Sequence, residues 1–180
     1  PGSSMGLMKK DMGGAAAVLG LANMIMALKL PLQLRVLIPA VENSVSADAF
    51  RPQDILASRK GLSVEINNTD AEGRLILCDA LTYAQEQPCD WLIDVATLTG
   101  AARVALGTEF WDPYETMIEP GIADLDNAPK GGFAGSITAA LFLRRFVTET
   151  PNYIHFDMYG WQPAAAPGRP KGGVGQGTRA

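Results

Sequence analysis

The sequence contains few of the residues on which zinc-binding and disulfide-bonded proteins depend. Its 180 residues include a single histidine, His155, and two cysteines, Cys78 and Cys89. One histidine excludes most histidine-rich zinc sites, so any metal site here is expected to be built from carboxylates. Two cysteines are too few for a disulfide framework, and they fit a reducing compartment.

Signals for membranes and secretion are also scarce. The apolar stretch 15–30 is shorter than the roughly 20 residues that a spanning helix needs, and Asn23 and Lys29 interrupt it. The first residues show no basic segment followed by an apolar run and a small-residue cleavage site. We therefore expect a cytoplasmic protein without a membrane partner.

Charge and composition indicate one packed domain that does not bind nucleic acid. Lysine and arginine total 15 against 19 for aspartate and glutamate, which gives a net charge of −4. Such a chain lacks the basic excess typical of nucleic-acid-binding domains. Hydrophobic residues make up 47% of the chain and charged residues 19%, a balance too apolar for a disordered protein. We expect residues 1–180 to form a single domain.

The order of hydrophobic runs predicts alternating helices and strands. Strong helix formers predict helices over 8–30, 73–87 and 133–149, and a short helix over 101–106. Apolar and β-branched runs predict strands over 32–41, 62–66, 91–96 and 153–159. This alternation is typical of an α/β fold, here a three-layer sandwich with a central, largely parallel sheet flanked by helices.

The densest polar cluster is the segment 68–75 (NTDAEGRL), between a predicted strand and a predicted helix. Ligands of α/β sheets bind outside the carboxyl ends of the strands, which is where this segment falls. Asp70 and Glu72 are two residues apart in a turn, so their carboxylates can converge on one cation, and Arg74 adds a positive fork. The structural alternative is a helix whose first turn carries acids because they suit the helix dipole.

Other acidic residues have both structural and functional interpretations. Asp11 precedes Gly13 and Gly14 at a helix start, where an aspartate is usually a cap but could reach the same cation. His155 and Asp157 share one face of a strand and could form a catalytic dyad. No nucleophile for such a dyad is recognisable, and a hydrogen-bonded core histidine is the favoured alternative.

Two further features favour structural roles. Asp94 lies within an apolar strand and is expected to bond to nearby backbone. The segment 130–136 (KGGFAGS) opens a helix and could cradle an anion, but it lacks the spacing of a phosphate-binding loop. Close packing of this loop against the sheet is therefore favoured.

Four motifs together resemble the leucine aminopeptidase family, cytosolic two-metal exopeptidases that assemble as hexamers. Segment 68–75 is similar to the family signature, and 8–16 (MKKDMGGAA) resembles its aspartate-bearing helix start. Segment 39–43 (PAVEN), with 51–52 (RP), resembles its central loop, and 93–101 (IDVATLTGA) its substrate-side loop. The likeness extends over nearly the whole chain and is to the catalytic domain only.

The resemblance implies a metal site. Asp11, Asp70 and Glu72 would be ligands of two divalent ions, zinc, manganese or magnesium, with Glu72 bridging them. Arg74 would hold a bicarbonate ion that acts as general base. Oxygen ligands by themselves favour manganese or magnesium, and the resemblance adds zinc.

The resemblance also implies a substrate site and a function. Met12 and Gly100 would line the pocket for the N-terminal side chain of a peptide, while Thr97 and Leu98 would meet its main chain. The expected function is a metal-dependent aminopeptidase that removes apolar N-terminal residues. Two alternatives remain open: a carboxylate–metal phosphohydrolase with 131–135 as phosphate cradle, and a catalytically silent structural relative or fragment.

Three departures from the family pattern have consequences. The family's lysine and aspartate ligands and its catalytic lysine precede the segment aligned with Pro1, so these 180 residues alone are expected to be inactive. Only two residues separate Gly107 from Phe110 where the family has a longer stretch, which predicts an omitted loop between 109 and 110. Gln53 stands where the family usually has glycine.

Overall fold

The structure is a computed structural model that describes residues 8–103, 110–130 and 134–173. Its helices and strands alternate along the chain. In order they are η1 (Met8–Met12), α2 (Gly13–Ala27), β1 (Ile55–Ala57), β2 (Ser63–Glu65), α3 (Glu72–Ala84), β3 (Leu92–Ala96), η2 (Gly100–Arg103), η3 (Asp112–Ile118), β4 (Leu125–Asp126), α4 (Gly135–Arg144), β5 (Tyr153–Asp157), β6 (Trp161–Gln162) and β7 (Gly172–Gly173).

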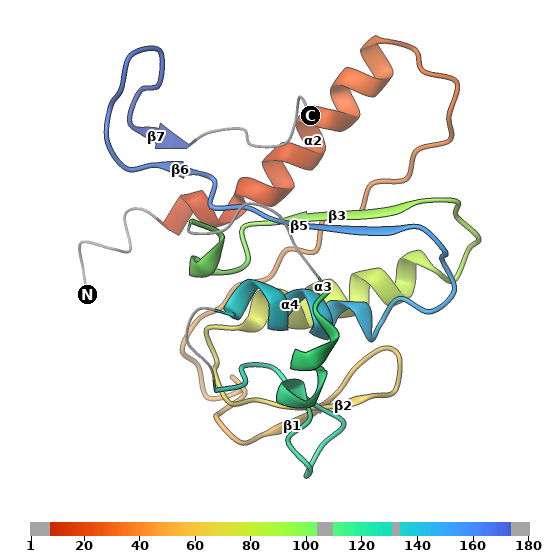
Figure 1. The fold of residues 1–180 in the computed structure, drawn as a ribbon, viewed down its shortest axis with the longest axis vertical. Coiled ribbons are helices and arrows are strands. Elements are labelled where there is room, and N and C mark those ends of the chain that lie inside the picture. Colours follow the sequence, from red (N-terminus) through yellow and green to blue (C-terminus); the bar gives the residue numbers. More distant parts are fainter. Residues whose placement is uncertain (1–7, 104–109, 131–133, 174–180) are drawn as a thin grey trace.

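The predicted α/β fold is confirmed, and the strand pairing is mixed. Strands β3 and β5 are parallel, with Asp94 opposite His155 and Ala96 opposite Asp157. Strand β2 pairs antiparallel with β1 and parallel with β4, and β6 pairs antiparallel with β7. Helix α2 lies along one side of the β3–β5 pair, while α3 and α4 lie on its other side, above β1 and β2 (Figure 1).

The core fills the space between α3, α4 and the strands on either side of them. Its fully buried members are mostly aliphatic and aromatic: Val64, Ile66, Cys78, Leu81, Ile118, Leu125, Leu141, Phe142, Leu143 and Phe146. Helix α4 contributes six consecutive buried residues, 138–143, because it is covered on all sides. This packing fixes the first turn of α3, where the polar cluster begins.

Segment 32–41 is not a strand, contrary to the prediction from its apolar, β-branched residues. Prolines at 31 and 39 remove backbone donors, and no neighbouring strand supplies a ladder for the exposed residues between them. The segment is attached to the end of α3 instead, where the Arg35 guanidinium donates to Gln87 Oε1 at 2.9 Å and to the carbonyl of Ala84. Strand β1 forms at 55–57, a segment for which the sequence analysis predicted no element.

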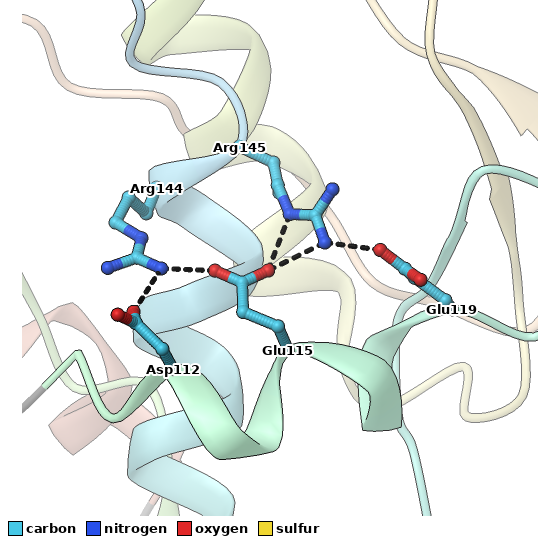
Figure 2. Close-up of polar contacts among 5 residues, drawn as sticks. All are labelled: Asp112, Glu115, Glu119, Arg144 and Arg145. Carbon is cyan, nitrogen blue, oxygen red and sulfur yellow. Dashed lines mark hydrogen bonds and ion pairs between the residues drawn. The ribbon is translucent and has the colours of Figure 1, made fainter.

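A network of ion pairs ties η3 to the end of α4 (Figure 2). The carboxylate of Glu115 lies between Arg144 and Arg145 and binds both, with Arg145 Nε at 2.7 Å. Arg144 also pairs with Asp112 at 2.7 Å, and Arg145 pairs with Glu119. The network joins segments about 30 residues apart in sequence, so it holds η3 against α4.

Within the described residues, no helix combines the length and apolarity needed to cross a bilayer.

Candidate active site

Asp11 lies at the junction of η1 and α2 and does not cap the helix. Met12 occupies the N-cap position, and no side chain caps the helix there. The Asp11 carbonyl oxygen accepts a hydrogen bond from Thr97 Oγ1 at 2.7 Å, which fixes its backbone beside the end of β3. Desolvation, and next the charge of Asp70, raise the pKa of the Asp11 carboxyl, while Lys10 opposes them. The capping interpretation is therefore wrong, and Asp11 faces another acid.

Glu72 begins α3, directly after the loop that carries Asp70. Its Oε2 accepts a hydrogen bond from Asn43 Nδ2 at 2.8 Å. Desolvation raises the pKa of the Glu72 carboxyl, and the charges of Asp11 and Asp70 raise it further. Three carboxylates from two distant segments thus lie within electrostatic reach of one another. Such repulsion disfavours ionisation unless a cation is shared.

These acids have the donor chemistry of a divalent-cation site, but they are not gathered at ligand distance. Carboxylate oxygens suit magnesium, manganese and zinc. Across residues 8–103, 110–130 and 134–173, no group of three or more histidine, cysteine, aspartate or glutamate side chains is placed to hold a metal ion. The residues present fit such ions in charge and donor type, although the structure does not bring them to ligand distance.

Arg74 is buried in the first turn of α3 with two nitrogens unused. Its Nε and Nη1 find no hydrogen-bond partner in the part of the chain that the structure describes. The guanidinium lies over the ring of Phe142, 6.0 Å from its centroid. Desolvation lowers the pKa of Arg74 to about 10, although the charges of Asp157 and Asp126 oppose the shift. A buried cation with free donors is a suitable partner for a small anion.

The loop after β3 lies against the start of α2. A Cβ added to Gly13 would come within 2.6 Å of Thr97 Cγ2, and one added to Gly160 within 2.9 Å of the same methyl group. A Cβ on Gly14 would come within 2.5 Å of the Ala96 Cα. Only glycine therefore allows α2 to lie this close to the end of β3.

The residues implied for the substrate site surround this loop. Thr97 is fixed between the two glycines and the carbonyl of Asp11, and Leu98 Cδ1 lies 3.1 Å from the position of a Cβ on Gly73. Gly100 opens η2 and has open space where a side chain would be. Met12, the neighbour of Asp11 in sequence, is 59% exposed, so its side chain is available to a ligand.

Asp157 is a polar residue of this region that sequence reasoning assigned only to a speculative dyad. Its Oδ1 accepts the backbone N–H groups of Leu98 and Thr99, each at 3.0 Å, and Oδ2 accepts the Thr99 hydroxyl. Asn43, the last residue of the PAVEN motif, was likewise given no role, yet it bonds Glu72. Both became visible only because the fold brings distant segments together.

His155 belongs to a buried network. Its Nδ1 lies 2.6 Å from Oδ1 of Asp94, whose Oδ2 accepts the hydroxyl of Tyr153 at 2.6 Å. Burial, and next the charge of Asp94, raise the pKa of Tyr153 above its usual range. The favoured core interpretation of His155 is confirmed. The expectation that Asp94 bonds to backbone is wrong, because its partners are two side chains of β5.

Two candidates fall outside the described residues. Residues 131–133 of the possible anion cradle are not described, nor is most of the junction before Phe110 at which a loop was expected. The short helix predicted over 101–106 begins as η2, and its second half is likewise not described.

The fold and site define an α/β domain that carries an acidic cluster and a buried arginine beside the end of a parallel strand pair. The family model "Cytosol aminopeptidase family, catalytic domain" matches residues 1–111 and 109–180. This chain therefore belongs to the cytosol aminopeptidase family.

Individual proteins that this chain resembles support the same family. The chain is 43% identical to a probable cytosol aminopeptidase of Syntrophotalea carbinolica, over 99% of this chain and 42% of that protein. It is 43% identical to leucine aminopeptidase 1 of Arabidopsis thaliana, over 89% of this chain and 36% of that protein. It thus spans less than half the length of these relatives.

Solved structures share the fold. Cytosol aminopeptidase from Coxiella burnetii superposes with a TM-score of 0.91 at 41% identity, covering 99% of this chain and 46% of that one. A mutant of tomato leucine aminopeptidase gives a TM-score of 0.80 at 36% identity, covering 96% of this chain and 39% of that one.

Proposed function

We propose that the protein containing this chain is a metal-dependent aminopeptidase that removes N-terminal residues, predominantly apolar ones, from peptides. The observation that carries the proposal is that Asp11 lies close to Asp70 and Glu72, although it comes from a segment about 60 residues away: the charge of Asp70 raises the pKa of Asp11, and the charge of Asp11 raises the pKa of Glu72. Membership of the cytosol aminopeptidase family supports the reaction class. Nothing in the described residues favours the phosphohydrolase alternative.

Asp11, Asp70 and Glu72 would hold two divalent ions, with Glu72 bridging. When bound, such ions polarise a scissile carbonyl and activate a water molecule. The amide of Asn43 orients the Glu72 carboxylate through the 2.8 Å hydrogen bond to Oε2. The hydrogen bond from Thr97 to the Asp11 carbonyl keeps the Asp11 backbone next to the loop after β3.

Arg74 would hold bicarbonate, which supplies a general base. Two unused, buried guanidinium nitrogens support this role, since each can donate to an anion without losing a protein partner. The pKa of about 10 keeps Arg74 protonated at neutral pH, so it remains a donor. An anion bound there would also neutralise the buried charge of Arg74, whose Nε and Nη1 have no hydrogen-bond partner among the described residues.

Substrate would bind across the loop after β3. The backbone of Thr97 and Leu98 would meet the peptide main chain, and Met12 with Gly100 would line the pocket for the N-terminal side chain. The exposed thioether of Met12 and the side-chain-free surface at Gly100 support a preference for apolar residues, because neither offers a charged partner.

The complete protein would supply what this chain lacks. The further lysine and aspartate ligands and the catalytic lysine would come from the preceding part of a longer chain. The family match in two segments that meet at 109–111 supports an additional loop there. The alignment with the Syntrophotalea protein, which extends over 211 residues, supports it as well. We further propose a cytoplasmic homohexamer.

Hydrolysis of leucine p-nitroanilide by the full-length protein, supplied with Mn²⁺ or Zn²⁺, tests this function. Activity should depend on added metal and fall by several orders of magnitude in Asp70→Ala and Glu72→Ala. Asp124→Ala is a matched control, because this exposed carboxylate caps a turn at β2 away from the site. Full activity in both site variants would contradict the assigned ligands, and a wild type that is inactive with either metal would favour a silent structural relative.

A further inference from the structure

Asp157 ends β5, and its carboxylate is occupied by the loop that follows β3. Oδ1 accepts the backbone N–H groups of Leu98 and Thr99, each at 3.0 Å, and Oδ2 accepts the Thr99 hydroxyl. The residue is 8% exposed. Hydrogen bonds to an ionised acceptor are roughly twice as strong as neutral ones. Three of them from two consecutive residues therefore fix this loop.

The parallel register explains why Asp157 reaches the loop. It lies opposite Ala96, the last residue of β3, so its side chain is level with the point at which β3 ends. The backbone N–H of Met158 donates to the Ala96 carbonyl at 2.8 Å and extends the pairing by one step. Beyond this point, the backbone N–H groups of the loop donate to the side chain of Asp157 and no longer to the backbone of β5.

The fixed loop touches two parts of the proposed site. The Thr97 hydroxyl donates to the Asp11 carbonyl at 2.7 Å, so the loop sets the backbone of a proposed metal ligand. Leu98 packs against Gly73 in the first turn of α3, where a Cβ would lie 3.1 Å from Leu98 Cδ1. The loop therefore lies between the start of α2 and the first turn of α3, and a shift would displace its own backbone relative to both.

We infer that Asp157 is a positioning residue, which holds loop 97–99 in the geometry in which its backbone meets the substrate. It acts through the loop and does not itself contact substrate. Its charge also acts on Arg74, and this effect is lost equally in every neutral variant of Asp157, so a difference between two such variants reports the loop. The inference rests on the proposed function, and it adds a residue to which that function assigns no role.

Kinetics of leucine p-nitroanilide hydrolysis by the full-length, metal-loaded protein test the inference. Asp157→Ala removes all three acceptors, and kcat/KM should fall about 100-fold, as a displacement of about 1 Å can cause. Asp157→Asn keeps an oxygen for the two backbone donors and an amide that can donate to the Thr99 hydroxyl, so kcat/KM should stay within about tenfold of wild type. Metal content should be unchanged in both variants.

Asp124→Ala is the matched control. Its carboxylate likewise accepts the backbone N–H and hydroxyl of one residue, Ser63, both at 2.7 Å, but between β2 and β4. Its kcat/KM should equal that of wild type. Equal kcat/KM for Asp157→Ala and Asp124→Ala, with an active wild type, would overturn the inference alone, and so would a loss that Asp157→Asn does not rescue. An inactive wild type would overturn the proposed function, and the inference with it.

A second variant covers the case in which Asp157→Ala does not fold. Thr99→Val removes only the hydroxyl bond to Oδ2 and keeps both backbone donors. Its thermal unfolding midpoint should stay close to that of wild type, while kcat/KM should fall about fivefold, as loss of one hydrogen bond implies. Unchanged kcat/KM in a folded Thr99→Val protein would overturn the inference.

Discussion

Replacing Arg74 with methionine should stabilise the anion-free protein while removing its response to bicarbonate. The guanidinium is buried, and Nε and Nη1 lack partners among the described residues. Burial lowers its pKa from the ordinary range of arginine to about 10, which at about 1.4 kcal/mol per tenfold change corresponds to a cost of about 3 kcal/mol for keeping the charge in the folded state. Methionine has a similar length and no charge, so much of this cost should be recovered.

Proton binding decides whether the free energy of unfolding rises or falls with pH. Burial disfavours the protonated form, so between about pH 10 and the ordinary, higher pKa of arginine the unfolded chain holds a proton that the folded chain has released. The cost is therefore fully present at neutral pH. In wild type the free energy of unfolding should rise with pH across this window, and in Arg74→Met this contribution should be absent.

The assay is urea unfolding of the full-length protein in carbonate-free buffer and again in bicarbonate. Arg74→Met should raise the free energy of unfolding by about 1–3 kcal/mol without the anion. Bicarbonate should stabilise wild type, by about 3 kcal/mol at 100 times its dissociation constant, and should leave Arg74→Met unchanged. Arg59→Met is the control, because Arg59 is exposed and paired with Glu86, and its unfolding should be nearly unaltered in either buffer. A destabilised Arg74→Met, or one that bicarbonate still stabilises, would refute the reasoning.

Three further predictions concern stability and use thermal unfolding. Gly14→Ala places a methyl group against the backbone of β3, and the midpoint should fall by the equivalent of about 1–3 kcal/mol; an unchanged midpoint would show that α2 can move away. Glu115→Gln weakens the ion pairs with both arginines of Figure 2. The free energy of unfolding should fall by about 1 kcal/mol or less, and this decrease should be smaller in 1 M salt. Gln53→Gly relieves a backbone φ of 75° and should raise the midpoint by the equivalent of about 0.5–1 kcal/mol, whereas a lower midpoint would contradict this.

Much of the fold could be predicted because its central elements have strong local signals. Helix α3 was predicted within one residue at its start, since the polar cluster marks it and Pro88 follows its end. Strand β3 was predicted within one residue because its apolar run is short and bounded by turns. In both, propensity and tertiary packing favour the same structure.

Other elements depend on partners that the sequence does not reveal. Segment 32–41 has strand-like composition, yet no neighbouring strand pairs with it, and propensity without a ladder gives no strand. Strand β1 has only three residues and exists because β2 lies antiparallel to it. The short helix η3 is held by residues of α4 and its end, about 30 residues away, through ion pairs and through the burial of Ile118 in the core.

In the candidate site, too, some residues could be predicted from local sequence and others depend on contacts between distant segments. Asp70, Glu72 and Arg74 are adjacent in sequence, so their grouping could be predicted from the segment alone. The proximity of Asp11 required the resemblance, because only the approach of α2 to β3 brings it there. Asn43 and Asp157 act through long-range hydrogen bonds, to Glu72 and to loop 97–99, for which a lone sequence carries no signal.

The most direct test of the account is anomalous diffraction from crystals of the full-length protein grown with Mn²⁺. The account predicts two manganese peaks between Asp11, Asp70 and Glu72, with carboxylate oxygens of all three at about 2.0–2.2 Å from an ion and Glu72 touching both. Peaks bound by other residues, or a fully active crystal form with no metal near these three carboxylates, would contradict it.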